Sequence, residues 1–375
     1  MKDVCILTAG IGSRMGPYSS TVNKAILPIN FKGLISHIIE KFDKDNRFII
    51  ALGHKSKQVK SYIDIAHPHI NVNYVYVKNY DGHNSGPGHS LYCCKESLKK
   101  EFYFVACDTL WSDENITETE EESWFGVKKL DSIEDAIDYC NFEYDKDNIV
   151  KINDKRKVDN LTNVAFTGLC YIKDYKLFWE GLESKKTING EIQISNGIEN
   201  LVLQRKAKLK YISWIDVGDY KKYKNEVIKY ENYDFSKQDE FLYFAQNKVI
   251  KYFNNDNIAK NRVLKARLNQ KVFPEILDSK NNFYSYNFLD GKTLYKKNDI
   301  RTFNALLNFL KNNLWDLQLK DYDSDLFHDS CELFYIKKTK QRIELFQKKY
   351  PNYEKENTLI NGSQIPTLEN LLTKK

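Results

Sequence analysis

The first 110 residues alternate short apolar runs with segments in which apolar residues recur every three or four positions. Short apolar runs are typical of buried strands, and the longer period is typical of helices that pack on one side. The expected order is strand 4–8, helix 35–42, strand 48–52, helix 57–65, strand 72–77, helix 91–97 and strand 102–106. Strands that alternate with helices predict βαβ units, and therefore a mostly parallel sheet with helices on both faces.

Between about 124 and 215 the expected strands lie closer together along the chain. They are 124–129, 137–144, 148–152, 164–172 and 208–214, with a helical segment over 190–203 before the last strand. Close spacing favours antiparallel pairing, so this stretch is expected to extend the sheet and to form one wall of a binding pocket. The predicted fold class of the first 230 residues is α/β, a Rossmann-like, mostly parallel sheet with an antiparallel extension.

A polar stretch at 231–240 has the composition of a linker. After it the sequence predicts strands 241–245, 248–253 and 283–289, a helix over 259–269, and long helices over 300–317 and 331–350. We therefore expect a first domain at 1–230, the linker at 231–240, and a smaller α+β region with long helices at 241–375. A fragment that ends in the linker, at 236, is expected to fold alone.

The composition narrows the class of protein. With 42% apolar and 29% charged residues the chain is expected to be globular. No apolar run reaches the ~20 residues that span a bilayer, and no leader-like segment precedes the first strand, so we expect a cytoplasmic protein without a membrane partner. The net charge of +6 is spread along the chain, which argues against nucleic acid as a partner. The seven cysteines include no Cys-x-x-Cys pair and are expected to be reduced.

The first strand ends in a glycine-punctuated loop, at the sheet edge where ligands of open α/β sheets bind. Gly10 and Gly12 leave backbone N–H groups open to phosphate oxygens, and Arg14 and Lys24 supply positive charge. The glycine spacing, completed by Gly16, fits neither the Gly-x-Gly-x-x-Gly motif nor the P-loop. The loop therefore indicates an anion site suited to a triphosphate.

Residues 7–15, followed by Lys24-Ala25-Ile26-Leu27-Pro28, resemble the signature of nucleotidyltransferases that activate sugar 1-phosphates or phospho-alcohols, a family with a GT-A-like fold. The resemblance implies that the loop binds a nucleoside triphosphate, that Arg14 holds its phosphates, and that Lys24 stabilises the reacting phosphoryl centre. The nucleotide-binding residues implied here are Leu7, Ala9, Gly10, Gly12, Ser13, Arg14 and Lys24. A strand-turn-helix with solvated charges is the alternative, and the agreement of two spaced motifs disfavours it.

Two aspartates stand at the ends of apolar runs. Asp108 follows the run 102–107, and Asp216 follows the run 211–215. A nucleotidyl transfer joins two anions, so a divalent metal is expected, and Mg²⁺ prefers hard oxygen ligands. In the family that the opening resembles, one aspartate follows a strand and the other lies in a Trp-x-Asp-x-Gly motif, as Asp216 does here. We expect both to bind Mg²⁺, with Arg14, Lys24 and Asp108 as the catalytic residues.

The segment 84–91 resembles the family's second glycine segment, which lies against the nucleobase and then begins a helix. Gly86 and Gly88 would admit the plane of a base, and Ser90 would either cap the helix or bond the base. As an isolated sequence, the segment is equally typical of a tight turn. The family's usual threonine and alanine are replaced by proline and glycine, which leaves CTP, UTP and GTP as alternatives.

Three residues resemble the family's acceptor-binding positions. Lys155 matches a lysine that contacts the acceptor phosphate, although Arg156 replaces the usual following proline. Gly168 and Glu191 match positions that bind acceptor hydroxyls. For Glu191, an exposed acid at a helix start is an equal alternative. The expected partners are an NTP and a small phosphorylated acceptor, and a homo-oligomer is left open.

Residues 247–294 resemble, more weakly, the amino-terminal lobe of choline-kinase and aminoglycoside-phosphotransferase-like proteins, with Lys251 as the strand lysine that would meet ATP. The His-x-Asp catalytic loop that such kinases need does not follow.

Taken together, the motifs of the first domain predict an Mg²⁺-dependent nucleotidyltransferase that releases pyrophosphate. Its expected use is the biosynthesis of capsule or other surface polysaccharide, or of headgroups. The alternatives are a bifunctional kinase–nucleotidyltransferase with a truncated kinase half, and a non-catalytic nucleotide-binding scaffold.

Overall fold

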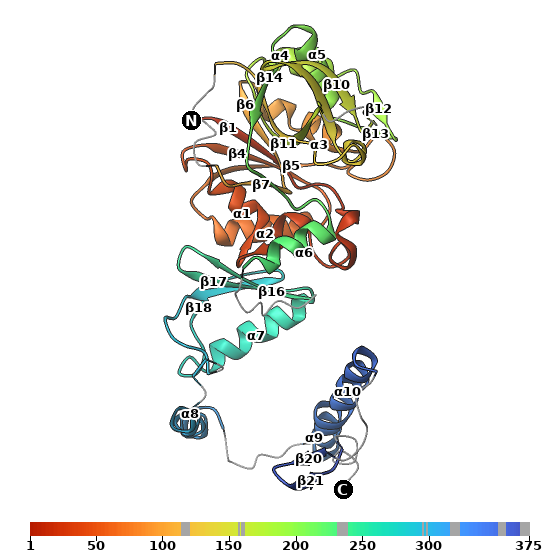
Figure 1. Ribbon diagram of the computed structural model, residues 1–375. Helices are drawn as coiled ribbons and strands as arrows, with labels where there is room; N and C mark the ends of the chain where they lie inside the picture. The colour runs from red at the N-terminus through yellow and green to blue at the C-terminus, as the bar shows by residue number, and fades with distance from the viewer. Residues whose placement is uncertain are drawn as a thin grey trace. The chain divides into compact units, whose positions relative to one another are not determined.

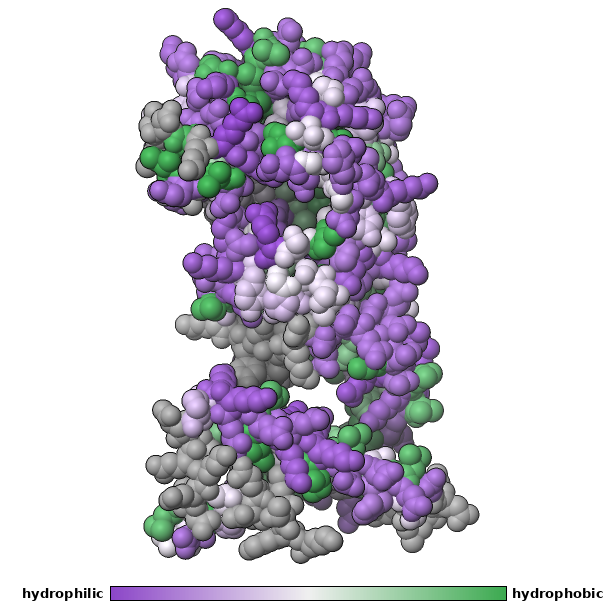
Figure 2. All heavy atoms as spheres, turned by 90° about the vertical axis from the view of Figure 1, so that its right-hand side faces the viewer, coloured by the Kyte–Doolittle hydropathy of each residue, from purple (hydrophilic) through white to green (hydrophobic). Residues whose placement is uncertain are grey.

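The computed structural model describes residues 1–113, 121–156, 158, 162–230, 239–294, 296–297, 299–315, 323–351 and 358–367. The chain divides into two compact units, Met1–Phe303 and Asn304–Lys375. The face of the molecule in Figure 2 is mostly hydrophilic, in keeping with the 29% of charged residues. Over the described residues, no helix combines the length and the apolar character that crossing a membrane requires.

A nine-stranded sheet forms the centre of the first unit, in the order β5-β4-β1-β6-β11-β8-β14-β10-β9. Its strands are β1 (Asp3–Leu7), β4 (Arg47–Leu52), β5 (Asn71–Tyr76), β6 (Phe102–Ala106), β8 (Trp124–Lys129), β9 (Cys140–Asp145), β10 (Asn148–Asp154), β11 (Val164–Ile172) and β14 (Lys208–Tyr211). Figure 1 shows its parallel strands β1 and β4 side by side. β5, β4, β1 and β6 are parallel, and β11 begins the extension by pairing antiparallel with β6. The predicted α/β sheet is confirmed.

Helices cover both faces of this sheet because successive side chains of β1 point to opposite sides. The helices are α1 (Leu34–Ile39), α2 (Ser56–Ala66), α3 (Pro87–Cys93), α4 (Tyr175–Leu182), α5 (Ser195–Leu203) and α6 (Tyr220–Ile228). Val4 and Ile6 belong to one buried cluster, with α1 and α2, and Cys5 and Leu7 to another, with α3, α4 and α5. The shorter elements are η1 (Ser13–Tyr18), η2 (Lys24–Ile26), η3 (Lys95–Ser97), η5 (Glu134–Ile137) and the strand pairs β2 (Pro28–Ile29) with β3 (Lys32–Gly33), β7 (Thr109–Trp111) with β15 (Trp214–Asp216), and β12 (Thr187–Ile188) with β13 (Glu191–Ile192).

A second sheet is entirely antiparallel, in the order β16-β17-β19-β18. It comprises β16 (Glu240–Ala245), β17 (Lys248–Phe253), β18 (Ile276–Lys280) and β19 (Phe283–Asn287), with α7 (Asp256–Leu268) on one face. The other face joins the buried cluster that contains α2 and residues 22–29. One hydrophobic core therefore extends across the predicted linker, of which residues 231–238 lie outside the described part of the chain. This shared core is at odds with the expectation that 1–236 folds alone.

The second unit is mainly helical. The helix α8 (Ile300–Asn313) spans the boundary between the units. Later in the chain, α9 (Ser324–Cys331), η6 (Glu332–Lys337) and α10 (Lys338–Lys349) are continuous with one another, and β20 (Thr358–Ile360) and β21 (Ser363–Ile365) come after them. The helical stretch begins at 324 rather than the predicted 331, because Asp323 caps it by accepting a hydrogen bond from the Leu326 N–H. The predicted residues 316 and 317 lie outside the described residues.

Candidate active site

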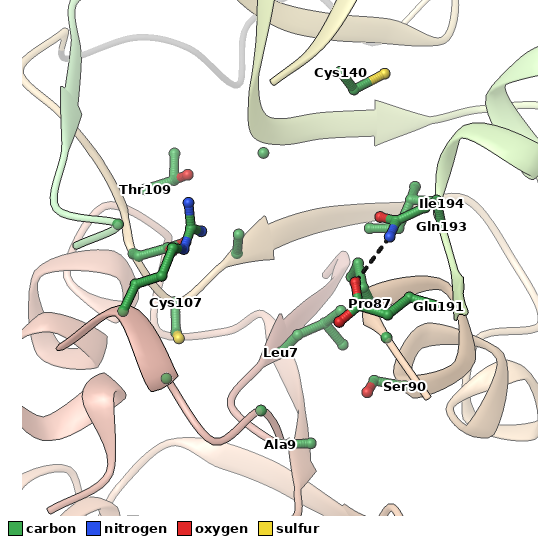
Figure 3. Close-up of a pocket in the computed structure, with 18 of the residues that line it drawn as sticks. Leu7, Ala9, Pro87, Ser90, Cys107, Thr109, Cys140, Glu191, Gln193 and Ile194 are labelled. Atoms are coloured by element: carbon green, nitrogen blue, oxygen red, sulfur yellow. Dashed lines mark hydrogen bonds between the residues drawn. The ribbon is translucent and has the colours of Figure 1, made fainter. Parts of the chain in front are cut away.

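A cavity of about 740 Å³ opens at the carboxyl ends of β1 and β6 in the first unit. Figure 3 shows its two sides, with Cys107 and Thr109 across from Glu191, Gln193 and Ile194. Most of the residues predicted from the sequence line it: Leu7, Ala9, Gly10, Gly12, Ser13, Arg14, Lys24, Gly86, Ser90, Asp108, Gly168, Glu191 and Asp216. Gly88 and Lys155 are not among the lining residues. Side chains from both halves of the sheet therefore meet in one pocket of ligand size.

The glycine loop is held in place by a buried asparagine that the sequence interpretation did not single out. Asn23, 1% exposed, donates from Nδ2 to the carbonyls of Thr8 (2.9 Å) and His54 (2.7 Å). Gly12 has φ of +70°, which favours glycine, and Gly10 has open space where a side chain would stand. Asn23 directly precedes Lys24 in the second motif, and this position is the feature of the sequence that could have indicated its role. The loop thus presents bare backbone to the cavity.

Lys24 lies at the centre of the site. Its Nζ donates to Asp108 Oδ2 at 2.6 Å and to the carbonyl of Gly218 at 2.7 Å, and its side chain is 9% exposed. Burial by itself raises the pKa of the Asp108 carboxyl, but the ammonium of Lys24, assisted by Arg14, outweighs burial and holds the pKa below its ordinary value. The Asp108 carboxyl is therefore ionised at neutral pH, and the pair places a cation and an anion side by side.

Asp216 reaches the same region because β15 pairs with β7, with Asp216 opposite Thr109. Its Oδ1 accepts from the Gly218 N–H at 2.8 Å, and its Oδ2 accepts from Tyr139 Oη at 2.8 Å and Lys222 Nζ at 2.7 Å. Burial opposes the charge on Lys222, but the contacts with Asp216 and Tyr139 raise its pKa above the ordinary value. Nothing in the spacing of Tyr139 and Lys222 pointed to this contact, which depends on the fold.

The two aspartates fit a divalent cation together with a ligand. A Cβ on Gly218 would stand 2.8 Å from Asp216 Oδ1 and 3.7 Å from Asp108 Oδ2, so both carboxylates face one small volume. Mg²⁺ is usually held by one or two carboxylates, with phosphates and waters completing its shell. In the described part of the chain, no group of three or more His, Cys, Asp or Glu side chains is arranged to hold a metal. The donor set therefore suits a cation that arrives with a phosphate ligand.

The second glycine segment packs against the β12–β13 hairpin. A Cβ on Gly86 would lie 2.8 Å from the carbonyl of Ile192, and a Cβ on Gly88 would lie 2.6 Å from the carbonyl of Gln193. Ser90 is 6% exposed and lines the cavity. Close packing on the hairpin thus accounts for both glycines, and Gly86 and Ser90, unlike Gly88, also line the cavity.

The three predicted acceptor residues do not lie together: Glu191 lines one side of the cavity, Gly168 lies beside Thr109 on the other, and Lys155 is outside the lining. Lys155 Nζ is 3.8 Å from Glu191 Oε2, which also accepts from Gln193 Nε2 at 3.0 Å (Figure 3). Gly168, with φ of +85°, allows β11 to approach Thr109, since a Cβ there would lie 2.9 Å from Thr109 Oγ1. The sequence interpretation missed Asp154, which precedes Lys155, is 7% exposed, lines the cavity and accepts from Ser195 Oγ.

The cavity's thiols are poor nucleophiles. Burial, with Asp108 nearby, raises the pKa of Cys107 to about 12, and burial raises the pKa of Cys140 well above the ordinary value. Both thiols are protonated at neutral pH. No histidine stands among the described residues that line the cavity, so the chemistry of the site is that of cations, carboxylates and backbone donors.

Comparisons with known proteins agree with this geometry. Residues 4–120 match the family model of the MobA-like NTP transferase domain. The chain is 26% identical over 231 residues to the bifunctional protein GlmU of Methanocaldococcus jannaschii and 24% identical over 225 residues to that of Methanococcus vannielii, in each case over 58% of this chain. These matches cover 51% and 52% of the two relatives, so the chain spans about half the length of the curated relatives it matches.

The fold is similar to solved nucleotidyltransferase structures. A UDP-glucose pyrophosphorylase complexed with UDP-glucose superposes with a TM-score of 0.53 at 19% identity, over 61% of this chain and 98% of that chain. The UTP-bound UGPase from Acinetobacter baumannii superposes with a TM-score of 0.51 at 15% identity, over 61% of this chain and 93% of that chain. The sequence matches bear out the predicted class of enzyme, since the chain resembles nucleotidyltransferases. The superpositions show that it shares their fold.

Proposed function

We propose that this chain transfers a nucleoside monophosphate from an NTP to the phosphate of a small acceptor, a sugar phosphate or a phospho-alcohol, and releases pyrophosphate. The observation that carries the proposal is the meeting of Lys24, Asp108 and Asp216 at the mouth of the glycine loop. This arrangement offers backbone donors for a triphosphate, a cation for the reacting phosphoryl group, and two carboxylates for a metal.

In this reaction an oxygen of the acceptor phosphate attacks the α-phosphorus of the NTP, and the bond from that phosphorus to the pyrophosphate oxygen breaks. The acceptor phosphate is already ionised near neutral pH, so the site needs no general base, in keeping with a lining of described residues that has no histidine. Arg14 and Lys24 would neutralise the triphosphate, and Lys24, next to Asp108, would meet charge that grows on the transferring group.

Asp108 and Asp216 would hold the cation, for which we propose Mg²⁺. When bound, Mg²⁺ would supply positive charge against the phosphates. Lys222 would hold the Asp216 carboxylate in position through its 2.7 Å contact with Oδ2, leaving Oδ1 on the Gly218 side. Gly86 and Ser90 would lie beside the base, and Gly168 and Glu191 beside the acceptor. Lys155 is outside the cavity lining and would contribute positive charge from beside Glu191, whose Oε2 lies 3.8 Å from the Lys155 Nζ.

The relatives support the proposal at the level of chemistry. The solved structures named above contain UTP or UDP-glucose, which favours a pyrimidine nucleotide and a sugar phosphate among the alternatives. Use in surface polysaccharide or headgroup biosynthesis and a cytoplasmic location both stay predictions. The antiparallel sheet with α7 agrees with the expected α+β character of the later region, and its likeness to a kinase lobe also stays a prediction.

The test is pyrophosphate release by the full chain with Mg²⁺, using each of the four NTPs against hexose 1-phosphates, heptose 1-phosphates, phosphocholine, phosphoethanolamine and glycerol phosphate. We expect release that needs both an NTP and an acceptor, and that is lost in Asp216→Asn. A folded protein that releases no pyrophosphate with any pair would favour the non-catalytic scaffold. ATP-dependent phosphorylation of the unphosphorylated alcohols would instead favour the bifunctional kinase.

A further inference from the structure

The segment that carries Lys24 is held by buried tyrosines from beyond the region that resembles nucleotidyltransferases. Tyr252 on β17 donates its hydroxyl to the Thr21 carbonyl at 2.8 Å, three residues before Lys24. Tyr243 on β16 donates to the Ile26 carbonyl at 2.8 Å, two residues after it. Both tyrosines are 0% exposed. The second sheet therefore contacts the backbone on each side of the central lysine.

A glutamine connects this contact to the glycine loop. Gln58 on α2 donates from Nε2 to Tyr252 Oη at 2.9 Å and to the Thr21 carbonyl at 3.1 Å, while its Oε1 accepts from the Asn23 N–H at 3.0 Å. Asn23 in turn donates to the Thr8 carbonyl at the end of β1. A continuous set of buried hydrogen bonds thus runs from the second sheet to both parts of the proposed triphosphate site.

The two faces of the second sheet pack against different parts of the chain, so a tyrosine on each face can be compared. Tyr243 and Tyr252 point to the face that packs on α2 and residues 22–29, whereas Tyr284 on β19 points to the face covered by α7. Tyr284 is 8% exposed and its ring stacks on Phe253 at 5.9 Å. A hydroxyl removed from Tyr284 therefore leaves the Lys24 segment untouched, which makes Tyr284 a matched control.

We infer that the β16–β17 sheet is a positioning element of the active site, in which the hydroxyls of Tyr243 and Tyr252 fix the backbone on both sides of Lys24 and so place its Nζ beside Asp108. Lys24 is held at its far end by Asp108 and the Gly218 carbonyl, so its ammonium stands at a defined point only if its backbone does as well. The catalytic part of this inference rests on the proposed nucleotidyl transfer, whereas the structural part does not.

Hydrogen exchange tests the structural part without any substrate. In the full chain we compare wild type, Tyr243→Phe/Tyr252→Phe and Tyr284→Phe by mass spectrometry. The double variant keeps both aromatic rings but leaves the Ile26 carbonyl without its donor. Amides in 21–29 are therefore expected to exchange several-fold to about 10-fold faster, which corresponds to the loss of about one hydrogen bond. Exchange in β1, β4 and β6 should be unchanged, as should all exchange in Tyr284→Phe. Unchanged exchange at 21–29 in the double variant would overturn the inference.

If the double variant does not fold, Tyr243→Phe alone serves the same comparison, because Gln58 and Tyr252 still bind the Thr21 carbonyl. In that single variant, faster exchange at residues 24–27 supports the inference, and exchange at the wild-type rate overturns it.

Kinetics then tests whether the tyrosines act through Lys24. We expect kcat of the double variant to fall about 10-fold, with a smaller change in KM. In a Lys24→Met background the same two substitutions should change kcat less than about 2-fold, because a residue that acts through another has no further effect once that one is gone. Equal losses in both backgrounds would mean a general structural effect and would overturn the catalytic part. Absence of turnover in wild type would count against the proposed function alone, because hydrogen exchange still decides the positioning.

Discussion

Replacement of Lys24 by methionine removes the ammonium but keeps most of the aliphatic stem. Two contacts are lost: the 2.6 Å pair with Asp108 and the 2.7 Å hydrogen bond to the Gly218 carbonyl. The side chains of Lys24 and Asp108 are 9% and 26% exposed, so the pair lies between a surface ion pair, which contributes about 0–1 kcal/mol, and a buried pair, whose disruption costs about 3–5 kcal/mol. We expect a loss of about 2 kcal/mol in the free energy of unfolding near pH 7.

The sign of the pH dependence follows from Asp108. Its pKa is lowered in the folded protein, largely by Lys24, so ionisation of this carboxyl contributes stability above the ordinary value of 3.8 that is lost as the pH falls through the lower folded pKa. Without Lys24 the pKa of Asp108 rises. The difference in stability between wild type and Lys24→Met should therefore be greatest near neutral pH and should shrink as the pH falls below about 4.

Urea unfolding at several pH values, together with steady-state kinetics, measures both effects. We expect kcat to fall on the order of 10²-fold or more while KM for the NTP changes less, because Lys24 is expected to meet charge that develops in the transition state. Lys206→Met is the matched control, since Lys206 forms a 2.6 Å pair with Asp174 while its side chain is 47% exposed. A kcat that holds while KM rises would refute the assigned role, and a loss of stability no larger than that of Lys206→Met would refute the magnitude.

Three further predictions follow from the site and the core. Asp108→Asn should fold but lose most Mg²⁺-dependent pyrophosphate release, because an amide lacks the charge that holds the metal; release at the wild-type rate would remove Asp108 from the site. Gly88→Ala should lower stability by about 1–3 kcal/mol in thermal or urea unfolding, because its Cβ would lie 2.6 Å from the Gln193 carbonyl, whereas Gly291→Ala, with nothing within 4 Å, should be neutral. A 1–236 fragment should aggregate, because it exposes the core residues that pack on Tyr243, Ile250, Tyr252 and Phe283; a soluble fragment with a cooperative transition in calorimetry would contradict the shared core.

Local patterns of apolar and polar residues predicted much of the central fold. The apolar runs of β1, β4 and β6 and their alternation with helices fix a parallel sheet, and the glycine loop and Asp108 stand at its carboxyl edge by the geometry of that sheet. The prediction of Asp216 needed the Trp-x-Asp-x-Gly motif as well as the strand end, because its strand β15 lies outside the large sheet and, among the described strands, pairs with β7.

What the sequence could not supply are contacts between segments far apart in the chain. Lys222 and Tyr139 meet at Asp216 although they are 83 residues apart, and Tyr252 reaches Thr21 across 231 residues. Such pairs have no local periodicity. For the same reason the polar composition of 231–240 predicted a linker but gave no indication that the β16–β17 sheet shares its core with α2. The sequence analysis did not predict the strand β18, because its five residues show no clear alternation of apolar and polar side chains and its Leu277 is exposed.

The central claim is that the chain joins a nucleoside monophosphate to an acceptor phosphate. Phosphorus-31 NMR of the full chain with Mg²⁺ and the NTP and acceptor pair that releases pyrophosphate tests it most directly. We expect a pair of coupled signals from a new diphosphate linkage, one pyrophosphate for each linkage formed, and reversal when pyrophosphate is added to the isolated product. Formation of free nucleoside monophosphate or orthophosphate, with the acceptor signal unchanged, would contradict the account.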